Sequence, residues 1–450
     1  MKNLNSISII DICEKAVNFG LECGADDIEV FSSVEKTINS SIESNAVKTV
    51  TSHQLQGLGI RVIKSGSLGF ASTNSYDVID IKNTISKALK IASMVPSDQF
   101  NKLPESKSSS LVTKLYDPHV EEFKIEDAFE KTSNMILTTK ETDQRISIDS
   151  GGFSSSIGDS ILINSNGIKA EEKESLFSWN IMGMASNGVD VSNFDVQYGG
   201  SRSLKDISLS QSIEEFANNV TSSLGSNKIE SFKGDVILSP EASLDVLIEP
   251  IIHLVNSKNV QKGLSKFKNK LNDSISSELL TVFDDGTING GLMSSNFDRE
   301  GVPHKKTIII DSGILKSYLY NNYSANKDQL QSTGNASGSY RSIPSISPTN
   351  LMLEPGSSKL SQIITSLSKG ILVTRFSGNV NPISGEFSGV VKGGKYIENG
   401  SIKYPIKECL ISGNIFDLLI GLNDISKENK RLFGFTLPYL HVNNVSITAG

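Results

Sequence analysis

The most informative segment of this chain is Ser239-Pro-Glu-Ala-Ser-Leu-Asp-Val-Leu-Ile-Glu-Pro-Ile-Ile-His-Leu-Val-Asn256. Ser239 is a favourable N-cap residue and Pro240 suits the first helical position, so a helix is predicted to begin here. The body of this helix is apolar on almost every side, which is typical of a helix buried in the centre of a domain. Pro250 removes one helical hydrogen bond and is expected to kink or open the helix. We therefore expect a domain that is built around this segment.

Two polar side chains, Glu249 and His253, interrupt this apolar helix at a spacing that puts them on one face. One hypothesis places them in a metal or acid–base site. In the other, they pair with each other or with nearby backbone, or they lie on a face that reaches water. A zinc peptidase helix normally supplies two histidines and a glutamate, and here there is one histidine. The spacing alone therefore favours the second hypothesis.

The composition excludes several classes of protein. The chain has 450 residues, which is enough for two or three domains, and its formal net charge of -7 argues against a general nucleic-acid-binding protein. The three cysteines, Cys13, Cys23 and Cys409, are too scattered for a disulfide framework and fit a reducing compartment. No run of about 18 apolar residues predicts a membrane span, and no signal peptide is visible after Met1. We expect a cytoplasmic protein without a membrane partner.

The first half of the chain shows the same order of elements twice. Helices are predicted over residues 8–23 and 78–94, with five short strands of an antiparallel meander between them, at 28–31, 37–42, 47–51, 57–63 and 67–71. A second unit has helices at 125–139 and 213–224, with hairpin signals at Asn166-Gly167 and Asn187-Gly188. The segment between the two units is rich in proline and serine, which predicts a linker or a loop on the surface.

The predicted fold class is therefore α+β, with an N-terminal part of two helix–meander–helix units and a C-terminal β-rich domain around the buried helix. The predicted boundaries are 1–95 for the first unit, 96–120 for the linker, 121–228 for the second unit and 229–450 for the C-terminal domain. In that last domain, residues 371–376 read as a strand that runs into a polar loop at 377–382. Such a loop is a natural rim for a groove, and a strand with a free edge could take up an extended peptide.

Four segments of the C-terminal part carry a resemblance to a known family. They are Phe297-Asp-Arg-Glu-Gly-Val-Pro303, Gly370-Ile-Leu-Val-Thr-Arg-Phe-Ser-Gly-Asn-Val-Asn-Pro382 with Ser384-Gly-Glu-Phe387, Tyr396-Ile-Glu-Asn-Gly-Ser-Ile-Lys-Tyr-Pro405, and Ser412-Gly-Asn414. Together these segments resemble the TldD/PmbA family, whose members are also called modulator of DNA gyrase proteins. The resemblance implies an α+β chain that takes part in cytoplasmic peptide proteolysis. Within the first segment, Asp298 and Glu300 look like parts of a structured turn rather than catalytic carboxylates.

The chain departs from the family's zinc site. The peptidase subunit, TldD, carries His-Glu-x-x-x-His, and the matching positions here read Ile248-Glu249-Pro-Ile-Ile-His253. TldD also carries a cysteine ligand near its C-terminus, and the matching region, about residues 428–438, holds no cysteine. Cys409 lies earlier and is expected to be a buried structural thiol. The chain thus resembles the TldE/PmbA type, in which Glu249 and His253 are vestigial and no cofactor is held.

These features predict a TldE/PmbA-like subunit of a metalloprotease complex that acts on flexible or unfolded peptides. The resemblance implies a TldD-like partner that supplies zinc, and self-association as a homodimer stays open. Candidate residues for the peptide cleft are Arg375, Ser377, Gly378 and Asn379. Two alternatives are an autonomous metallopeptidase with an unusual site and a non-catalytic peptide-binding scaffold.

Overall fold

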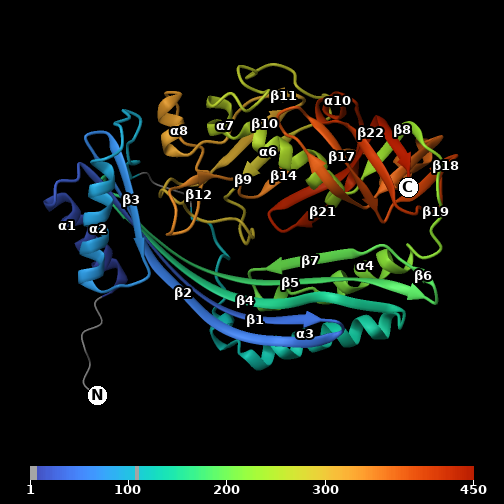
Figure 1. Ribbon diagram of the computed structural model, residues 1–450, viewed down its shortest axis with the longest axis horizontal. Helices are drawn as coiled ribbons and strands as arrows, with labels where there is room; N and C mark the ends of the chain where they lie inside the picture. The colour runs from blue at the N-terminus through green and yellow to red at the C-terminus, as the bar shows by residue number, and fades with distance from the viewer. Residues whose placement is uncertain (1–7, 107–110) are drawn as a thin grey trace.

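The computed structural model describes residues 8–106 and 111–450. A long curved sheet formed by the first half of the chain runs beneath the elements of the C-terminal half (Figure 1). Helices of the first half cover the ends and the outer side of this sheet. The predicted α+β class is confirmed. No helix in the described part of the chain is long and apolar enough to cross a membrane.

The first unit contains three long strands where five short ones were predicted. Its elements are α1 (Ile9–Glu22), β1 (Asp27–Glu43), β2 (Ala46–Lys64), β3 (Ser67–Thr73) and α2 (Val78–Ala92). The predicted strands at 28–31 and 37–42 both belong to β1, and those at 47–51 and 57–63 both belong to β2. Antiparallel pairing continues from Asp27↔Ile63 to Glu43↔Ala46, so the polar residues between the apolar runs stay within the strands. The polar stretches were misread as turns because one face of this sheet is not buried in a core.

The second unit completes the same sheet. Its elements are η1 (Pro118–Glu122), α3 (Ile125–Thr142), β4 (Ile146–Asn164), β5 (Lys169–Asn187), β6 (Asp190–Val191), β7 (Asp195–Ser201), η2 (Leu204–Asp206) and α4 (Leu209–Thr221). Strand β4 pairs with β1, which gives the order β3-β2-β1-β4-β5-β6, and β7 also pairs with β5. The two units are therefore halves of one sheet. Phe153, Phe177 and Phe216 are fully buried between this sheet and the helices.

The C-terminal half forms a larger β-rich body. Its sheet has the order β11-β10-β9-β14-β22-β8-β15-β18-β19, with β16, β17, β20 and β21 attached off this path. The strands are β8 (Phe232–Leu238), β9 (Val282–Asp285), β10 (Lys306–Asp311), β11 (Ile314–Leu315), β12 (Ala336–Ser337), β13 (Ser345–Ile346), β14 (Leu351–Leu353), β15 (Lys369–Val373), β16 (Arg375–Val380), β17 (Glu386–Lys392), β18 (Lys395–Glu398), β19 (Ser401–Pro405), β20 (Cys409–Asn414), β21 (Leu422–Leu432) and β22 (Phe435–Ala449). The short helices are α7 (Ser257–Gln261), α8 (Asn322–Lys327), α9 (Leu360–Ser366) and α10 (Ile415–Ile420).

The buried helix lies in the core of this body, as predicted, and it is not regular. It consists of α5 (Pro240–Ser243), a π-helical turn η3 (Leu244–Ile248) and α6 (Glu249–Val255). The Ser239 side chain accepts a hydrogen bond from the backbone N–H of Ala242, which is the predicted N-cap. The π turn ends just before Pro250, whose missing N–H breaks the regular hydrogen-bond ladder. Pro250 therefore opens the helix as expected.

The segment predicted as a linker lies against the C-terminal body. The backbone N–H of Val112 donates to Asn296 Oδ1 at 2.8 Å, and that of Thr113 donates to Asn289 Oδ1 at 2.9 Å. Leu103 and Leu115 are buried. The three serines Ser108, Ser109 and Ser110 fall outside the described residues. What is described of this segment is thus attached at several points along its length.

A buried ionic cluster joins the sheet to the C-terminal body. Glu29 of β1 pairs with Arg61 of β2 and, at 2.9 Å, with Nη1 of Arg299, while Arg61 Nη1 pairs with Glu300 Oε1 at 2.6 Å. Burial raises the pKa of Glu29, but the two guanidinium groups more than offset this, and the net shift is downward. Asp298, beside this cluster, accepts hydrogen bonds from the backbone N–H groups of Glu300, Val302 and Ala336. Asp298 and Glu300 thus hold a turn and a domain contact, in agreement with the structural interpretation.

Candidate active-site cleft

The opened helix and strand β16 form the two walls of a cleft. Its volume is about 430 Å³, and its lining consists of Asp245, Glu249, Pro250, Phe376, Ser377, Gly378, Val380 and Pro382. The π turn places Asp245 and Glu249 in the same wall. Ser377 and Gly378 come from the opposite wall, so the structure brings the helix candidate Glu249 together with two of the predicted cleft residues. His253, Arg375 and Asn379 are not among the lining residues.

The cleft has an acidic floor. Burial and the neighbouring Glu249 and Glu241 carboxylates together raise the pKa of Asp245 to about 6, although Arg375 opposes them. Tyr198, on β7 across from this helix, has its pKa raised to about 12 by burial and by the carboxylates of Glu241 and Asp245. Asp245 therefore takes up a proton at a higher pH than an ordinary aspartate does. When it is protonated, such a carboxyl group can donate a hydrogen bond to a bound chain, and when it is ionised it can accept one.

We expect Asp245→Asn to raise the free energy of unfolding at pH 8 by about 1–2 kcal/mol. The pKa of Asp245 in the folded chain, about 6, lies above its ordinary value of 3.8. Above the folded pKa, the native state therefore holds a charge that is disfavoured relative to the unfolded state, and asparagine removes it. Below pH 3.8, the ordinary pKa, Asp245 is protonated in both the folded and the unfolded state. The stabilisation by asparagine therefore decreases as the pH falls. Urea unfolding at pH 8 and at pH 4.5 measures the difference.

The control for this prediction is Asp149→Asn, since Asp149 is an exposed carboxylate on β4. It is expected to change the unfolding free energy little at either pH. A gain for Asp245→Asn that is the same at both pH values would show that the charge of Asp245 is not disfavoured in the cleft.

The hypothesis that Glu249 and His253 pair is not realised in this structure. Asn259 Nδ2 lies 3.2 Å from His253 Nδ1 and also donates to the His253 carbonyl oxygen at 3.0 Å. Nδ1 is therefore the acceptor, and the proton lies on Nε2, which is buried and has no hydrogen-bond partner among the described residues. The two side chains share a helix, but Glu249 faces the cleft and His253 is held by the following helix α7.

The donor groups at the position of the family's zinc site do not fit zinc. The Ile248 side chain is fully buried in the core and is a hydrocarbon, and Nδ1 of His253 is engaged by Asn259. Among residues 8–106 and 111–450, no group of three or more His, Cys, Asp and Glu side chains is arranged to hold a metal ion. A zinc site needs three or four such donors at about 2.0–2.3 Å. Cys409 is a buried thiol on β20 whose pKa is raised to about 11 by burial.

The region where the resemblance places a cysteine ligand presents a lysine instead. Lys430 of β21 extends Nζ to Glu241 Oε1 and Gln197 Oε1, each at 2.6 Å, and also to Glu215. Burial lowers the pKa of Lys430, but the carboxylates of Glu241 and Glu215 more than offset it, and the net shift is upward. Lys430 therefore ties the β21–β22 hairpin to the buried helix and to the N-terminal sheet.

The structure of strand β16 shows that the loop prediction for residues 377–379 was wrong, and it supports the idea of a strand with a free edge. Ser377, Gly378 and Asn379 were expected in a loop, yet they lie within β16 and pair with β17. Gly378 stands opposite Gly389, and a Cβ on Gly378 would lie 2.4 Å from the Gly389 Cα. The small residues that looked like a turn are therefore required by a close approach of two strands. Among the described strands, β16 pairs with β17 alone, so its other edge is free.

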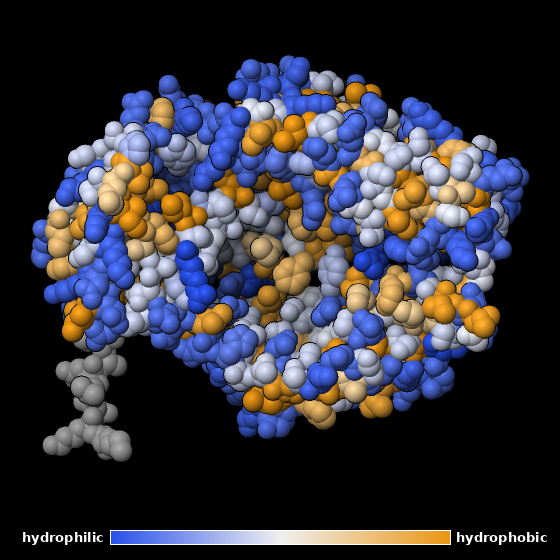
Figure 2. All heavy atoms as spheres, viewed as in Figure 1, coloured by the Kyte–Doolittle hydropathy of each residue, from blue (hydrophilic) through white to orange (hydrophobic). Residues whose placement is uncertain are grey.

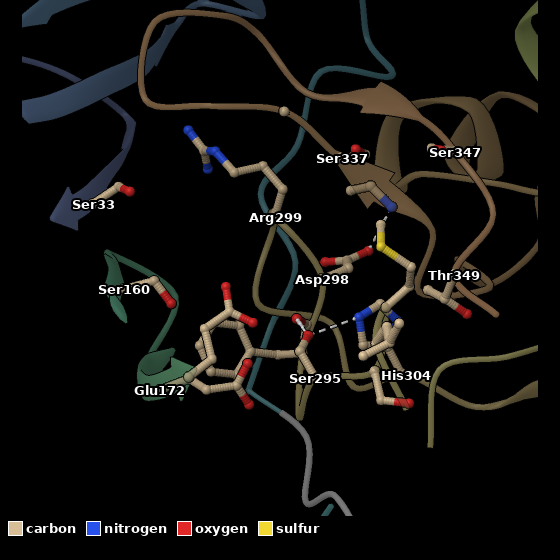
Figure 3. A pocket seen from close by; sticks show the side chains of 18 of the residues that line it. Ser33, Ser160, Glu172, Ser295, Asp298, Arg299, His304, Ser337, Ser347 and Thr349 are labelled. Atoms are coloured by element: carbon tan, nitrogen blue, oxygen red, sulfur yellow. Dashed lines mark hydrogen bonds between the residues drawn. The ribbon is translucent and has the colours of Figure 1, made fainter. Parts of the chain in front are cut away.

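A second cavity of about 420 Å³, which sequence analysis did not predict, lies between the N-terminal sheet and the C-terminal loops. Figure 3 shows hydroxyl groups of Ser33 and Ser160 on the sheet side and those of Ser337, Ser347 and Thr349 on the other. His304 Nε2 lies 3.0 Å from Ser295 Oγ, and burial lowers the pKa of His304 to about 4. Because Ser295 Oγ donates its proton to the Phe297 carbonyl oxygen, it accepts from His304. This serine is therefore not positioned as an activated nucleophile.

Sequence analysis missed Asp245, Lys430 and this second cavity. The available signal for the cavity was a period-two run of small or polar residues on the strands, at positions 33 and 35 of β1 and at 156, 158 and 160 of β4. Figure 2 shows a hollow between the lower sheet and the upper body. Asp245 gave no signal, because its position depends on the π turn.

Three family models match the chain. Residues 28–92 match PmbA/TldA metallopeptidase domain 1, residues 118–224 match the central domain, and residues 231–449 match the C-terminal domain. The protein named metalloprotease PmbA homolog from Buchnera aphidicola subsp. Acyrthosiphon pisum is 30% identical over 413 residues, which cover 90% of this chain and 89% of that protein. Metalloprotease PmbA from Escherichia coli O157:H7 is 27% identical over 443 residues, which cover 96% of each chain.

The fold is also similar to a solved structure. TldE from Thermococcus kodakarensis matches with a TM-score of 0.89 and 23% sequence identity, over 97% of this chain and 100% of that one. At this identity the match concerns the fold. It covers the sheet, the buried helix and the β-rich body together.

Proposed function

Since the chain belongs to the PmbA/TldD metallopeptidase family, we propose that it is the peptide-binding subunit of a two-subunit metalloprotease and does not hold zinc itself. The observation that carries this proposal is the buried Ile248 where the peptidase subunit has a histidine ligand. A TldD-like partner would supply zinc and the general base. This chain would bind and position flexible or unfolded peptides, and it would do so in the cytoplasm, where its exposed, unpaired Cys23 stays reduced.

The free edge of β16 supports the peptide-binding role. An extended chain that adds to this edge would form backbone hydrogen bonds with β16 and would lie over the acidic floor of the cleft. Backbone pairing depends on few side chains of the bound peptide, so it suits a protease that acts on unfolded segments of varied sequence. Asp245 and Glu249 would then face the bound peptide and disfavour acidic residues at that point through charge repulsion.

The expected result is that the isolated, untagged chain purifies with far less than one zinc ion per chain and has no chelator-sensitive peptidase activity. Elemental analysis of the chain alone and of its mixture with a TldD-like partner measures the first quantity, and cleavage of an unfolded peptide measures the second. Stoichiometric zinc in the isolated chain that is lost in Glu249→Gln would overturn the proposal. Activity of the partner that is unchanged by this chain would also count against it.

In the same mixture, Ser377→Trp should fill the cleft and lower peptide turnover by about tenfold while zinc content stays unchanged. Ser377 is exposed on β16, whereas Gly378 is unsuitable because its Cβ would clash with the paired strand. Ser361→Trp, at an exposed position on α9, is the matched control and should leave turnover unchanged. Equal turnover of both variants in an intact complex would remove β16 from the peptide path.

A further inference from the structure

A third cavity, of about 560 Å³, lies at a different junction of the two halves of the molecule. One wall comes from strands β2 and β3 and from the chain just after α2. The other wall comes from α7, α8 and the loop before β13. None of its lining residues belongs to the cleft beside β16.

The mouth of this cavity is apolar and exposed. Ile91 is 41% exposed, Val95 42% and Ile343 47%, and these three residues line the cavity from opposite sides. Leu68 and Phe70 of β3 line its interior. A contiguous group of large apolar side chains at the mouth of a cavity is characteristic of a binding site, because soluble proteins otherwise bury such groups.

The floor of the cavity carries a cation without an ion pair. Lys258 of α7 is half-buried, and its Nζ donates to the Pro344 carbonyl oxygen at 3.2 Å. No carboxylate in the described part of the chain lies within 4.0 Å of this Nζ. Burial lowers the pKa of Lys258, and the charges of Lys262 and Arg61 lower it further while the Glu300 carboxylate opposes them, so holding the charge there costs free energy. A bound anion would relieve this cost.

Three other charged residues, Arg61, Asp98 and Lys102, also line the cavity. Arg61 pairs with Glu29 and Glu300 in the buried ionic cluster. Asp98 accepts hydrogen bonds from the Tyr323 hydroxyl at 2.7 Å and from the backbone N–H of Phe100 at 2.9 Å. These neutral donors lower the pKa of Asp98 and leave its charge in place. Lys102 is exposed, whereas Lys258 is partly buried and has no ion pair among the described residues. The cavity thus combines an apolar mouth with one partly buried cation, Lys258, that has no ion pair in the described part of the chain.

We propose that this cavity binds the C-terminal residue of a peptide, with the free carboxylate on Lys258 and an apolar side chain against Leu68 and Phe70. The polar groups of Asn101 and Tyr323 also line the wall, and they suit the amide groups of a peptide better than the hydrocarbon tail of a fatty acid. Such a site would hold one end of a peptide away from the β16 cleft. The inference goes beyond the proposed function and depends on neither zinc nor a partner.

The test uses the full chain alone and a short fluorescent peptide of glycine and serine that ends in Leu-Phe. Fluorescence anisotropy compares the free acid with the same peptide amidated at its C-terminus. The amide should bind at least about tenfold more weakly, since it loses a charge-assisted hydrogen bond. Lys258→Met should cause the same loss for the acid, and Lys258→Arg should retain most of the binding. Lys262→Met, an exposed neighbour just after α7, is the control and should bind like the unmodified chain.

Equal binding of the acid and the amide would overturn the proposal. Displacement of the peptide by dodecanoate at a far lower concentration than by unlabelled peptide would also overturn it, in favour of a fatty-acid site. Melting temperatures verify that each variant is folded. If Lys258→Met fails to fold, Val95→Asp at the exposed mouth replaces it. That variant should abolish binding of the acid, and unchanged binding would refute the site.

Discussion

Replacing Glu29 with alanine is expected to lower the free energy of unfolding by about 3–5 kcal/mol, because it leaves two buried guanidinium groups without their shared carboxylate. The Glu29 side chain is 0% exposed, and those of Arg61 and Arg299 are 7% and 3% exposed. Two N–H positions of Arg299, Nε and Nη2, already lack a hydrogen-bond partner among the described residues. The guanidinium of Arg299 lies over the Phe31 ring at 3.9 Å, a contact that does not replace a carboxylate.

The same change should also loosen the attachment of the C-terminal body to the sheet. Glu29 and Arg61 belong to the sheet, whereas Arg299 and Glu300 belong to the C-terminal half. Urea unfolding followed by circular dichroism measures the stability, and limited proteolysis measures access to the chain between the two halves.

Glu43→Ala is the matched control on the same strand. Glu43 pairs with Lys48 at 3.1 Å, and the two side chains are 59% and 60% exposed. A surface pair of this kind contributes about 0–1 kcal/mol. Similar losses for the Glu29 and Glu43 variants would show that the buried cluster does not hold the two halves together.

Replacing Ile251 with aspartate should destabilise the chain by about 4–5 kcal/mol or more, because an unpaired charge would enter the core. Ile251 is 0% exposed and packs in the main hydrophobic cluster of the C-terminal body. Many domains have a total stability of only about 5–15 kcal/mol. The variant is therefore expected to be largely insoluble or unfolded, which soluble yield and circular dichroism measure.

Ile252→Asp is the matched control, with the same change at the next position. Ile252 is only partly buried, so its aspartate can reach water and the loss should be clearly smaller. Equal effects at the two positions would mean that the helix is not packed as the structure shows. The comparison tests the helix face directly, because neighbouring residues point in different directions around it.

Local patterns in the sequence were enough for the elements that depend on neighbouring residues. Ser239 and Pro240 marked the start of the buried helix, and Pro250 marked its break, because caps and proline act on the backbone within one turn. The order of the helix and strand signals indicated the α+β class, and Ile248 stands where the resemblance to TldD implies a histidine. These features need no knowledge of the tertiary partner.

Tertiary structure alone decided which segments meet. The sequence could not show that the two N-terminal units share one sheet, that residues 377–379 continue a strand, or that β16 faces the helix at Asp245 and Glu249. Hydrophobic periodicity fixes the face that a residue occupies and leaves open the segment that packs against it. The cleft, the bridging Lys430 and the cavity at Lys258 each join residues far apart in the chain. Their positions follow from long-range strand pairing and core packing, which local residue patterns do not specify.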